Sequence, residues 1–335
     1  MDILLICNYR PGVGGISGQV EILQRKLREE GHRTDIFSTK GSVFQRLLLP
    51  AKLRKAGRRY ALFHIHCCSG WGFLPAVVGV GVGRRLGKRT VLTYHGGGGE
   101  KFFERNPKLV RHFLLRTDRN IVLSGFLARV FDRFQLPYTV IPNIVELDPT
   151  LFRRRERLEA KYICTRAHEE LYNIPCILRA FRQVQQRLPD AALTLVGTGS
   201  QHQQLKQLSS ELGLRNVTFT GRVDNNEIYR HLDQSDILLS APRVDNMPVS
   251  LLEAMNAGLL VISSAVGGVP YIIDDNRTGL LFGSDDSDQL AAKMLQAVEQ
   301  QEESLAMVQE AHRAVNAYQW ENVKEKLYTA YGIHP

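Results

Sequence analysis

The chain has 335 residues, of which 44% are hydrophobic and 23% are charged, which excludes a disordered polymer and gives enough length for two domains. The net charge of +9 is unevenly divided: residues 1–160 carry 28 basic and 13 acidic side chains, whereas residues 161–335 carry 15 and 21. The basic first half is expected to contact something anionic, which leaves nucleic acid, a membrane surface and an acidic substrate open.

The sequence carries no targeting or metal-binding signature. Its first residues enter an apolar strand-like run without a basic leader, and no apolar run approaches the length of a membrane span. The five cysteines show no CxxC spacing, and four lie in or beside apolar runs. This pattern favours buried thiols in a reducing, cytoplasmic compartment over a zinc site or a disulfide framework.

Strand-like and helix-like segments alternate along the whole chain. In the first half we expect strands at 3–7, 34–37, 62–65, 90–94, 120–123 and 139–141, and helices near 16–30, 43–57, 72–86, 101–116 and 124–134. In the second half we expect strands at 161–164, 193–196, 217–219, 237–239, 260–263 and 280–282, and helices near 174–187, 201–212, 225–233, 248–257, 287–300 and 302–315. This alternation predicts an α/β protein with two Rossmann-like parallel sheets, separated by a polar linker at 142–155.

The first loop, residues 8–18, follows a strand and opens a helix. Its glycines, Gly14 and Gly15 among them, would let a diphosphate or a sugar approach the backbone. The spacing departs from the dinucleotide-binding fingerprint, and Asp35 lies inside the second strand rather than at its end. Both observations disfavour NAD as the ligand.

His95 lies in a loop with four glycines at the end of the fourth expected strand. The carboxyl ends of parallel strands are where ligands bind, so this position favours a functional histidine over a merely structural one. Asn143 follows the last strand of the first half, where it would act at a hinge.

Three loops of the second half also follow strands. Arg166 would supply positive charge to a diphosphate. The turn that contains Gly197 and Gly199, together with the backbone of Arg222 and Val223, would hold a nucleobase. Each loop alone is an ordinary turn, but all three are expected at one edge of the sheet.

Two carboxylates, Asp245 and Glu253, stand eight positions apart across a loop that enters a helix. We expect Pro248 in the first helical turn and Gly258 just past the end. The free N–H groups at such a helix start attract a phosphate. The neighbouring residues are therefore candidates for ligand binding: Asn246, Met247, Val249 and Ser250. The alternative on this segment alone is a surface helix capped by Asp245 or Asn246.

Taken together, these motifs resemble the retaining glycosyltransferases of family 4. The resemblance rests on order and spacing in the second half, at 196–199, 219–223, 250–255, 257–258, 266–270 and 278–281, and on Gly14, Gly15, His95 and 141–143 in the first. It implies the GT-B architecture, in which two Rossmann-like domains face a central cleft. The expected domains are an acceptor-side domain at 1–145, a nucleotide-sugar domain at 146–318, and a last helix at 319–335 that crosses back to the first.

The resemblance also implies a retaining hexosyltransferase that takes a UDP-, GDP- or ADP-sugar as its donor and requires no cofactor or metal. Glu253 would bind the ribose, and His95, Arg166 and Asp245 would act at the reacting sugar and diphosphate. Asp245 replaces the usual glutamate, and Tyr172 stands where the family often has a lysine. A sugar-nucleotide epimerase and an inactive sugar-nucleotide-binding relative are the alternatives.

The acceptor is expected on the basic half, as a glycan or a lipid-linked molecule. Residues 42–60 mix leucine and phenylalanine with six basic residues and no acid, which suits a peripheral position on the anionic inner face of a membrane. The alternative is an ordinary surface helix that packs Leu47, Leu48 and Leu53 inward. Nucleic-acid binding is disfavoured, because this segment lacks interleaved aromatic residues and matches no nucleic-acid module.

Overall fold

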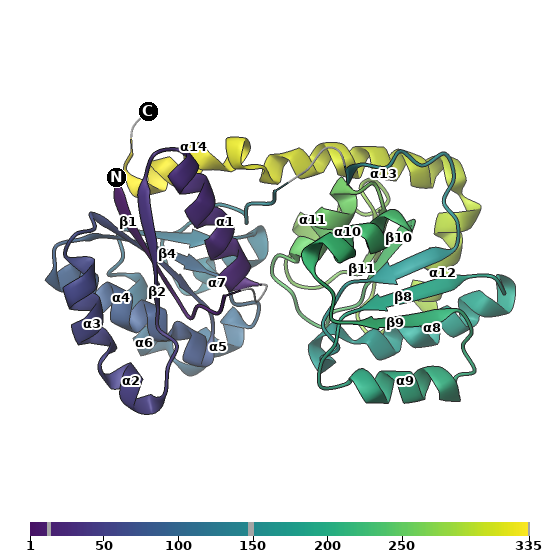
Figure 1. The fold of residues 1–335 in the computed structure, drawn as a ribbon, viewed down its shortest axis with the longest axis horizontal. Helices are drawn as coiled ribbons and strands as arrows, with labels where there is room; N and C mark the ends of the chain where they lie inside the picture. The colour runs from purple at the N-terminus through teal and green to yellow at the C-terminus, as the bar shows by residue number, and fades with distance from the viewer. Residues whose placement is uncertain (12–14, 147–150, 334–335) are drawn as a thin grey trace. The chain divides into compact units, whose positions relative to one another are not determined.

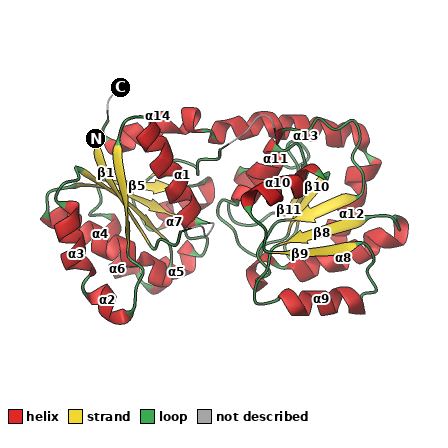
Figure 2. Ribbon diagram, in the orientation of Figure 1, coloured by secondary structure: helices red, strands yellow, loops and turns green. Residues whose placement is uncertain are grey.

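The computed structural model describes residues 1–11, 15–146 and 151–333, and the chain forms two compact units (Figure 1). Unit 1 consists of Met1–Glu146 and Tyr318–Pro335, and unit 2 consists of Leu147–Ala317. Each unit is a parallel sheet with helices on both faces (Figure 2). This confirms the predicted α/β class with two Rossmann-like sheets; the central cleft and the roles given to the domains stay predictions.

Unit 1 contains six parallel strands in the order β2-β1-β3-β4-β5-β6. The strands are β1 (Asp2–Cys7), β2 (Arg33–Ser38), β3 (Leu62–Cys67), β4 (Arg89–Tyr94), β5 (Arg119–Val122) and β6 (Thr139–Val140). The helices are α1 (Ile16–Glu29), α2 (Val43–Leu47), α3 (Leu49–Gly57), α4 (Leu74–Arg85), α5 (Gly99–Arg105), α6 (Pro107–Leu114), α7 (Gly125–Arg133) and α14 (Trp320–Tyr331), with the 3-10 turn η1 at Gly70–Phe73.

Side-chain alternation along the strands divides the core of unit 1 between two faces. Ile3 and Leu5 of β1 pack with α1 and α14, whereas Leu4 and Ile6 pack with α3, α4, α6 and α7. This is the period of two that a strand imposes, here with both faces covered as parallel sheets require.

Helix α14 belongs to unit 1 although the chain passes through unit 2 before reaching it. Trp320 and Leu327 share one hydrophobic cluster with α1 and the sheet, and Figure 1 shows α14 beside α1. The hydroxyl of Tyr331 lies 2.7 Å from Nδ1 of His64 on β3, and both side chains are buried. Gly332, in the left-handed region with φ 69°, ends the helix.

Unit 2 contains six parallel strands in the order β12-β11-β10-β7-β8-β9. The strands are β7 (Lys161–Cys164), β8 (Ala192–Val196), β9 (Val217–Gly221), β10 (Ile237–Ser240), β11 (Leu260–Ser264) and β12 (Leu280–Phe282). The helices are α8 (Ile174–Arg187), α9 (His202–Glu211), α10 (Asn225–Asp233), α11 (Val249–Asn256), α12 (Ser287–Glu299) and α13 (Gln301–Val315), with 3-10 turns at Glu170–Tyr172 and Val269–Tyr271. A further 3-10 turn, Asn316–Tyr318, lies where the chain passes from unit 2 back to unit 1.

The end of α11 is fixed by a buried arginine from the segment that the sequence assigned to the linker. Nη1 of Arg155 donates to the carbonyl oxygens of Ala257 at 3.0 Å and Gly258 at 2.6 Å, and its Nε donates to Asp236 at 2.8 Å. A guanidinium at the last carbonyls of a helix also suits the helix dipole. The charge run at 153–155 is therefore part of the packed structure of unit 2.

Proline explains where expected helices divide. The expected helix 43–57 is split at Leu48 into α2 and α3, with Pro50 in the first turn of α3. The expected helix 101–116 is split at Asn106 into α5 and α6, with Pro107 at the start of α6. Because proline has no N–H to donate to the carbonyl oxygen four residues earlier, and its ring clashes with that group, a helix tends to end before a proline and a new one begins.

Candidate active site

The candidate residues of unit 2 gather where its strand order reverses. From β7 the sheet grows through β8 to β9 on one side, and from β10 through β11 to β12 on the other, so β7 and β10 are neighbours. The loops that follow these two strands carry Arg166 and Asp245. Ligands of doubly wound sheets bind at such a reversal, outside the carboxyl ends of the strands.

Arg166 is held from three sides. Its Nη2 forms an ion pair with Asp245, and its Nη1 donates to Oγ of Ser250 at 3.0 Å. Its guanidinium carbon lies 4.1 Å from the centre of the Tyr172 ring, a cation–π contact. The Arg166 and Asp245 side chains are 12% and 17% exposed, so this cation lies in a largely enclosed position. Tyr172 thus supports the guanidinium, a role that the sequence did not indicate.

Helix α11 begins after Pro248, which occupies the N-cap position with φ −70° and ψ 108° and not the first helical turn as expected. No side chain caps the helix, and six of its eight residues are buried. The alternative of a surface helix capped by Asp245 or Asn246 is therefore wrong. Asn246, Met247 and Ser250 are buried, and Val249 is half-buried.

Glu253 lies on the second turn of α11 and is half-buried. Within the residues that the structure describes, its carboxylate has no hydrogen bond or ion pair. Burial raises the pKa of Glu253, and the positive charge of Arg166 opposes that rise. An enclosed carboxylate without a protein donor is suited to accept hydrogen bonds from hydroxyl groups of a ligand.

The backbone at Asp245 is fixed by the loop that follows β11. The N–H of Gly268 donates to the carbonyl oxygen of Asp245 at 2.9 Å. Gly267 has φ 53°, and a Cβ atom there would overlap the same oxygen. The turn at 267–270, part of the segment 266–270 that contributes to the family resemblance, therefore positions the loop that carries Asp245.

The residues assigned to a nucleobase also come together. The N–H of Gly197 donates to the carbonyl oxygen of Gly221 at 2.9 Å, which joins the turn after β8 to the end of β9. A Cβ atom on Gly199 would lie 2.5 Å from the carbonyl oxygen of His168, so the turns after β7 and β8 are in contact. Arg222 is exposed and Val223 is half-buried.

A pair of histidines beside these turns was missed by the sequence analysis. Nδ1 of His168 lies 2.8 Å from Nδ1 of His202, the rings stack at 4.9 Å, and Phe219 meets both edge-on. Burial lowers the pKa of His168 to about 4, so it is neutral at physiological pH. The two residues are 34 positions apart, and no local pattern connects them.

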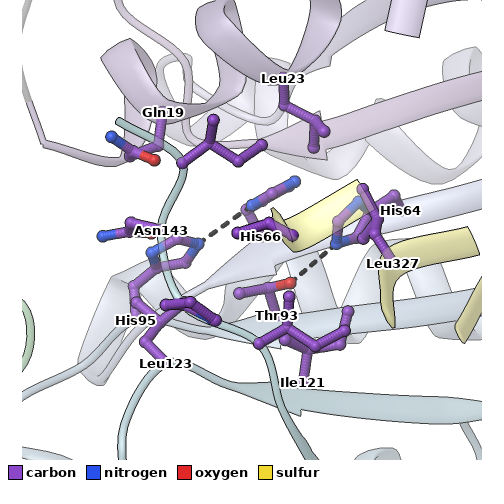
Figure 3. A pocket seen from close by; sticks show the side chains of 14 residues that line it. Gln19, Leu23, His64, His66, Thr93, His95, Ile121, Leu123, Asn143 and Leu327 are labelled. Atoms are coloured by element: carbon purple, nitrogen blue, oxygen red, sulfur yellow. Dashed lines mark hydrogen bonds between the residues drawn. The ribbon is translucent and has the colours of Figure 1, made fainter. Parts of the chain in front are cut away.

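In unit 1, His95 lines a small cavity of about 40 Å³ (Figure 3). Its Nε2 lies 3.0 Å from Nδ1 of His66, and Nε2 of His64 lies 2.8 Å from Oγ1 of Thr93. Burial lowers the pKa of His95 to about 4 and that of His64 to about 3. His95 is thus a neutral hydrogen-bonding group at physiological pH. The sequence did not indicate His66, because it lies inside a strand.

The remaining candidates of unit 1 are in the first loop. Gly15 precedes α1 with φ 70°, a conformation that favours glycine, whereas Gly14 lies outside the described residues. Asn143 lines the same cavity as His95.

Across residues 1–11, 15–146 and 151–333, no three His, Cys, Asp or Glu side chains converge as metal ligands. None of the helices in that part of the chain has the length and apolar composition needed to cross a membrane.

Two family models match consecutive parts of the chain. Residues 41–149 match "Glycosyltransferase Family 4", and residues 156–314 match "Glycosyl transferases group 1". A GDP-mannose-dependent alpha-(1-6)-phosphatidylinositol monomannoside mannosyltransferase of Mycobacterium tuberculosis is 26% identical over 92% of this chain and 78% of its own length. The N-acetyl-alpha-D-glucosaminyl L-malate synthase of Bacillus anthracis is 24% identical over 96% of this chain and 94% of its own length.

Solved structures share the fold at low sequence identity. HepE of Anabaena, in complex with UDP and glucose, has a TM-score of 0.80 at 17% identity and covers 99% of each chain. The sucrose-phosphate synthase of Thermosynechococcus elongatus has a TM-score of 0.81 at 20% identity and covers 99% of this chain and 98% of its own. These neighbours show the two-unit GT-B fold.

Proposed function

This chain belongs to the family 4 glycosyltransferases, which use nucleotide-sugar donors, and we propose that it transfers a hexose to a hydroxyl group of a lipid-linked acceptor with retention at the anomeric carbon. The observation that carries the proposal is the enclosed Glu253 carboxylate beside Arg166 at the strand reversal of unit 2. The matched relatives are transferases, so the epimerase alternative is not favoured.

In our proposal, the nucleotide-sugar donor binds along the loops of unit 2. Glu253 accepts hydrogen bonds from the ribose hydroxyls, and Asp245 accepts one from the donor sugar. The diphosphate contacts Arg166 and the N–H groups at the start of α11. The remaining donor contacts in unit 2 are with Asn246, Met247, Val249 and Ser250, and the nucleobase lies against Gly197, Gly199, Arg222 and Val223.

Charge stabilisation is the main catalytic contribution of unit 2 in this mechanism. As the bond between the anomeric carbon and the phosphate oxygen breaks, the nucleoside diphosphate gains negative charge, which Arg166 and the α11 N–H groups stabilise. The acceptor oxygen bonds to the same face of that carbon, and its proton passes to the departing phosphate oxygen. His95, being neutral, provides a hydrogen bond to a sugar or acceptor hydroxyl.

Donor identity and stereochemistry are testable directly. Relatives include a GDP-mannose-dependent enzyme, and a structural neighbour was solved with UDP and glucose, so calorimetric titrations with UDP-glucose, GDP-mannose and ADP-glucose form the screen. NMR of the purified product reports the anomeric configuration. Failure of all three donors to bind contradicts the donor site, and an inverted product contradicts retention.

Tyr172 is expected to act through Arg166. Tyr172→Ala removes the ring under the guanidinium and should lower kcat by roughly twofold to thirtyfold, which corresponds to a cation–π contact of about 0.5–2 kcal/mol. Tyr172→Phe keeps the ring and should retain kcat. Steady-state kinetics with both variants tests this prediction. If the hydroxyl group of Tyr172 were the important group, Tyr172→Phe would lower kcat as much as Tyr172→Ala does.

A lipid-linked acceptor requires contact with a bilayer, and α2 offers apolar side chains for it. Phe44 and Leu47 are 81% and 74% exposed, and Leu48 is 55% exposed, whereas Leu53 is fully buried. The alternative in which Leu47 and Leu48 pack inward is therefore wrong, although it holds for Leu53. We place this surface on an anionic membrane, where its arginines and lysines meet the headgroups.

Replacing Phe44 and Leu47 with serine should weaken sedimentation with vesicles of phosphatidylcholine and phosphatidylglycerol by at least roughly tenfold, because each buried apolar side chain contributes about 1.5–3 kcal/mol. Leu115→Ser is the control, since Leu115 is a further exposed leucine of unit 1, at 48%. Equal sedimentation of the double variant and the wild type would contradict this membrane contact.

A further inference from the structure

A second, larger hollow in unit 1 has no part in the site described above. This groove, of about 590 Å³, lies between the loops that follow β3 and β4 and the helices α5 and α6. It shares no lining residue with the cavity of His95. Its walls include Trp71, Lys101, Arg105 and Leu109.

The groove concentrates positive charge. Lys101 and Arg105 lie four positions apart on α5, are exposed, and form no ion pair or side-chain hydrogen bond with the described residues. The acids of the same helix are occupied elsewhere, because Arg133 pairs with Glu100 at 2.5 Å and with Glu104 at 2.9 Å. Like charges at this spacing repel each other across a helical turn, and an anion bound between them would remove that repulsion.

The same groove presents apolar surface. Trp71 is 77% exposed and Leu109 is 40% exposed, so large apolar side chains lie beside the two cations. The guanidinium of Arg46, on α2, lies 5.1 Å from the centre of the Trp71 ring, which links the groove to the exposed apolar residues of α2. Cations beside an exposed tryptophan match the boundary between lipid headgroups and acyl chains.

We propose that this groove binds the phosphate-bearing headgroup of an acidic lipid, with the phosphate between Lys101 and Arg105 and the acyl attachment along Trp71 and Leu109. The inference rests on the proposed transfer to a lipid-linked acceptor and gives that acceptor a seat on unit 1. A bidentate guanidinium and a nearby ammonium are the groups that hold phosphate oxygens. Trp71 supplies the amphipathic ring that the interface favours.

Trp71 also reports binding, because the chain has two tryptophans and Trp320 is only 6% exposed. With vesicles of phosphatidylcholine and phosphatidylglycerol, the emission should shift to shorter wavelength and brominated acyl chains should quench it. Vesicles of phosphatidylcholine alone should give neither effect. Trp71→Phe, a change at an exposed position, should abolish both the emission shift and the quenching. This result would show that Trp71 is their source.

The paired substitution Lys101→Gln and Arg105→Gln should weaken binding to the acidic vesicles by about thirtyfold, or about 1 kcal/mol for each cation. Arg119→Gln with Lys326→Gln removes the same charge from exposed positions of unit 1 that have no described side-chain partner, and it should have a much smaller effect. An equal loss in the two double variants would show general charge attraction and overturn the site.

Soluble competitors identify the source of the phosphate. Monomeric short-chain phosphatidylglycerol should shift the Trp71 emission, whereas inorganic phosphate alone should not; an equal response to both overturns the lipid assignment. A stronger response to a single-stranded oligonucleotide than to acidic vesicles also overturns it. If no lipid binds while a nucleotide sugar still titrates, the groove proposal fails and the donor site stands; if the donors also fail, the proposed function itself is wrong.

Discussion

Replacing Arg166 with methionine is expected to lower kcat by about a hundredfold to a thousandfold. The guanidinium is the cation enclosed at the strand reversal, and loss of one charge-stabilising group at a reacting centre costs about 2.7–4 kcal/mol. KM for the donor should rise less than kcat falls, since the negative charge develops in the transition state. Steady-state kinetics and a thermal unfolding curve measure both effects.

The control for this variant is Arg187→Met. Arg187, at the end of α8, pairs with Glu299 at 3.1 Å and is 64% exposed, so its ion pair contributes at most about 1 kcal/mol to stability. Its loss should leave kcat nearly unchanged. Wild-type kcat in Arg166→Met would contradict the role of this cation.

Replacing Glu253 with glutamine is expected to weaken donor binding by about tenfold to a hundredfold, because hydrogen bonds to a charged group contribute about 1.5–3 kcal/mol. The same substitution should keep or raise the free energy of unfolding. Burial raises the pKa of Glu253 in the folded state, so the folded protein binds this proton more tightly than the unfolded chain does. The wild type therefore loses stability as pH rises through that pKa, and the glutamine variant does not.

At neutral pH the Glu253→Gln variant should unfold at or above the wild-type temperature while binding the donor more weakly. Glu302→Gln, at an exposed position of unit 2 without a described partner, should change neither property. Calorimetric titration with the donor and thermal unfolding at several pH values separate the two effects. Undiminished donor affinity in Glu253→Gln would remove the observation on which the proposed function depends.

The sequence predicted the sheets well because parallel strands buried on both faces are continuous apolar runs, as in β1 and β10. It also placed candidate residues at strand ends, and the structure brings Arg166, Asp245 and Glu253 together there. That success follows from topology, since the loops after neighbouring parallel strands must meet at one edge.

The contacts between side chains were not predictable in the same way. The ring of Tyr172 under Arg166, the histidine pair of His66 and His95, and the burial of Arg155 all depend on how distant segments pack. The family resemblance indicated a missing lysine at Tyr172, and the polar charge run placed Arg155 in a linker. His66 lies just past the strand expected at 62–65 and carried no assignment. Inward packing of Leu47, the alternative to a membrane contact, follows the usual burial of apolar side chains, and the structure instead exposes Leu47.

The arrangement of the chain determines how the protein can be taken apart. Unit 2 is one uninterrupted segment, whereas unit 1 is assembled from two segments that meet where the N–H of Val145 donates to the carbonyl oxygen of Tyr318 at 3.0 Å. A direct join of Glu146 to Tyr318 would therefore leave α14 next to its cluster in a shortened, single-sheet protein. Such a protein would separate the lipid recognition that we propose for unit 1 from the sugar-nucleotide recognition that we propose for unit 2, without altering a side chain of the groove.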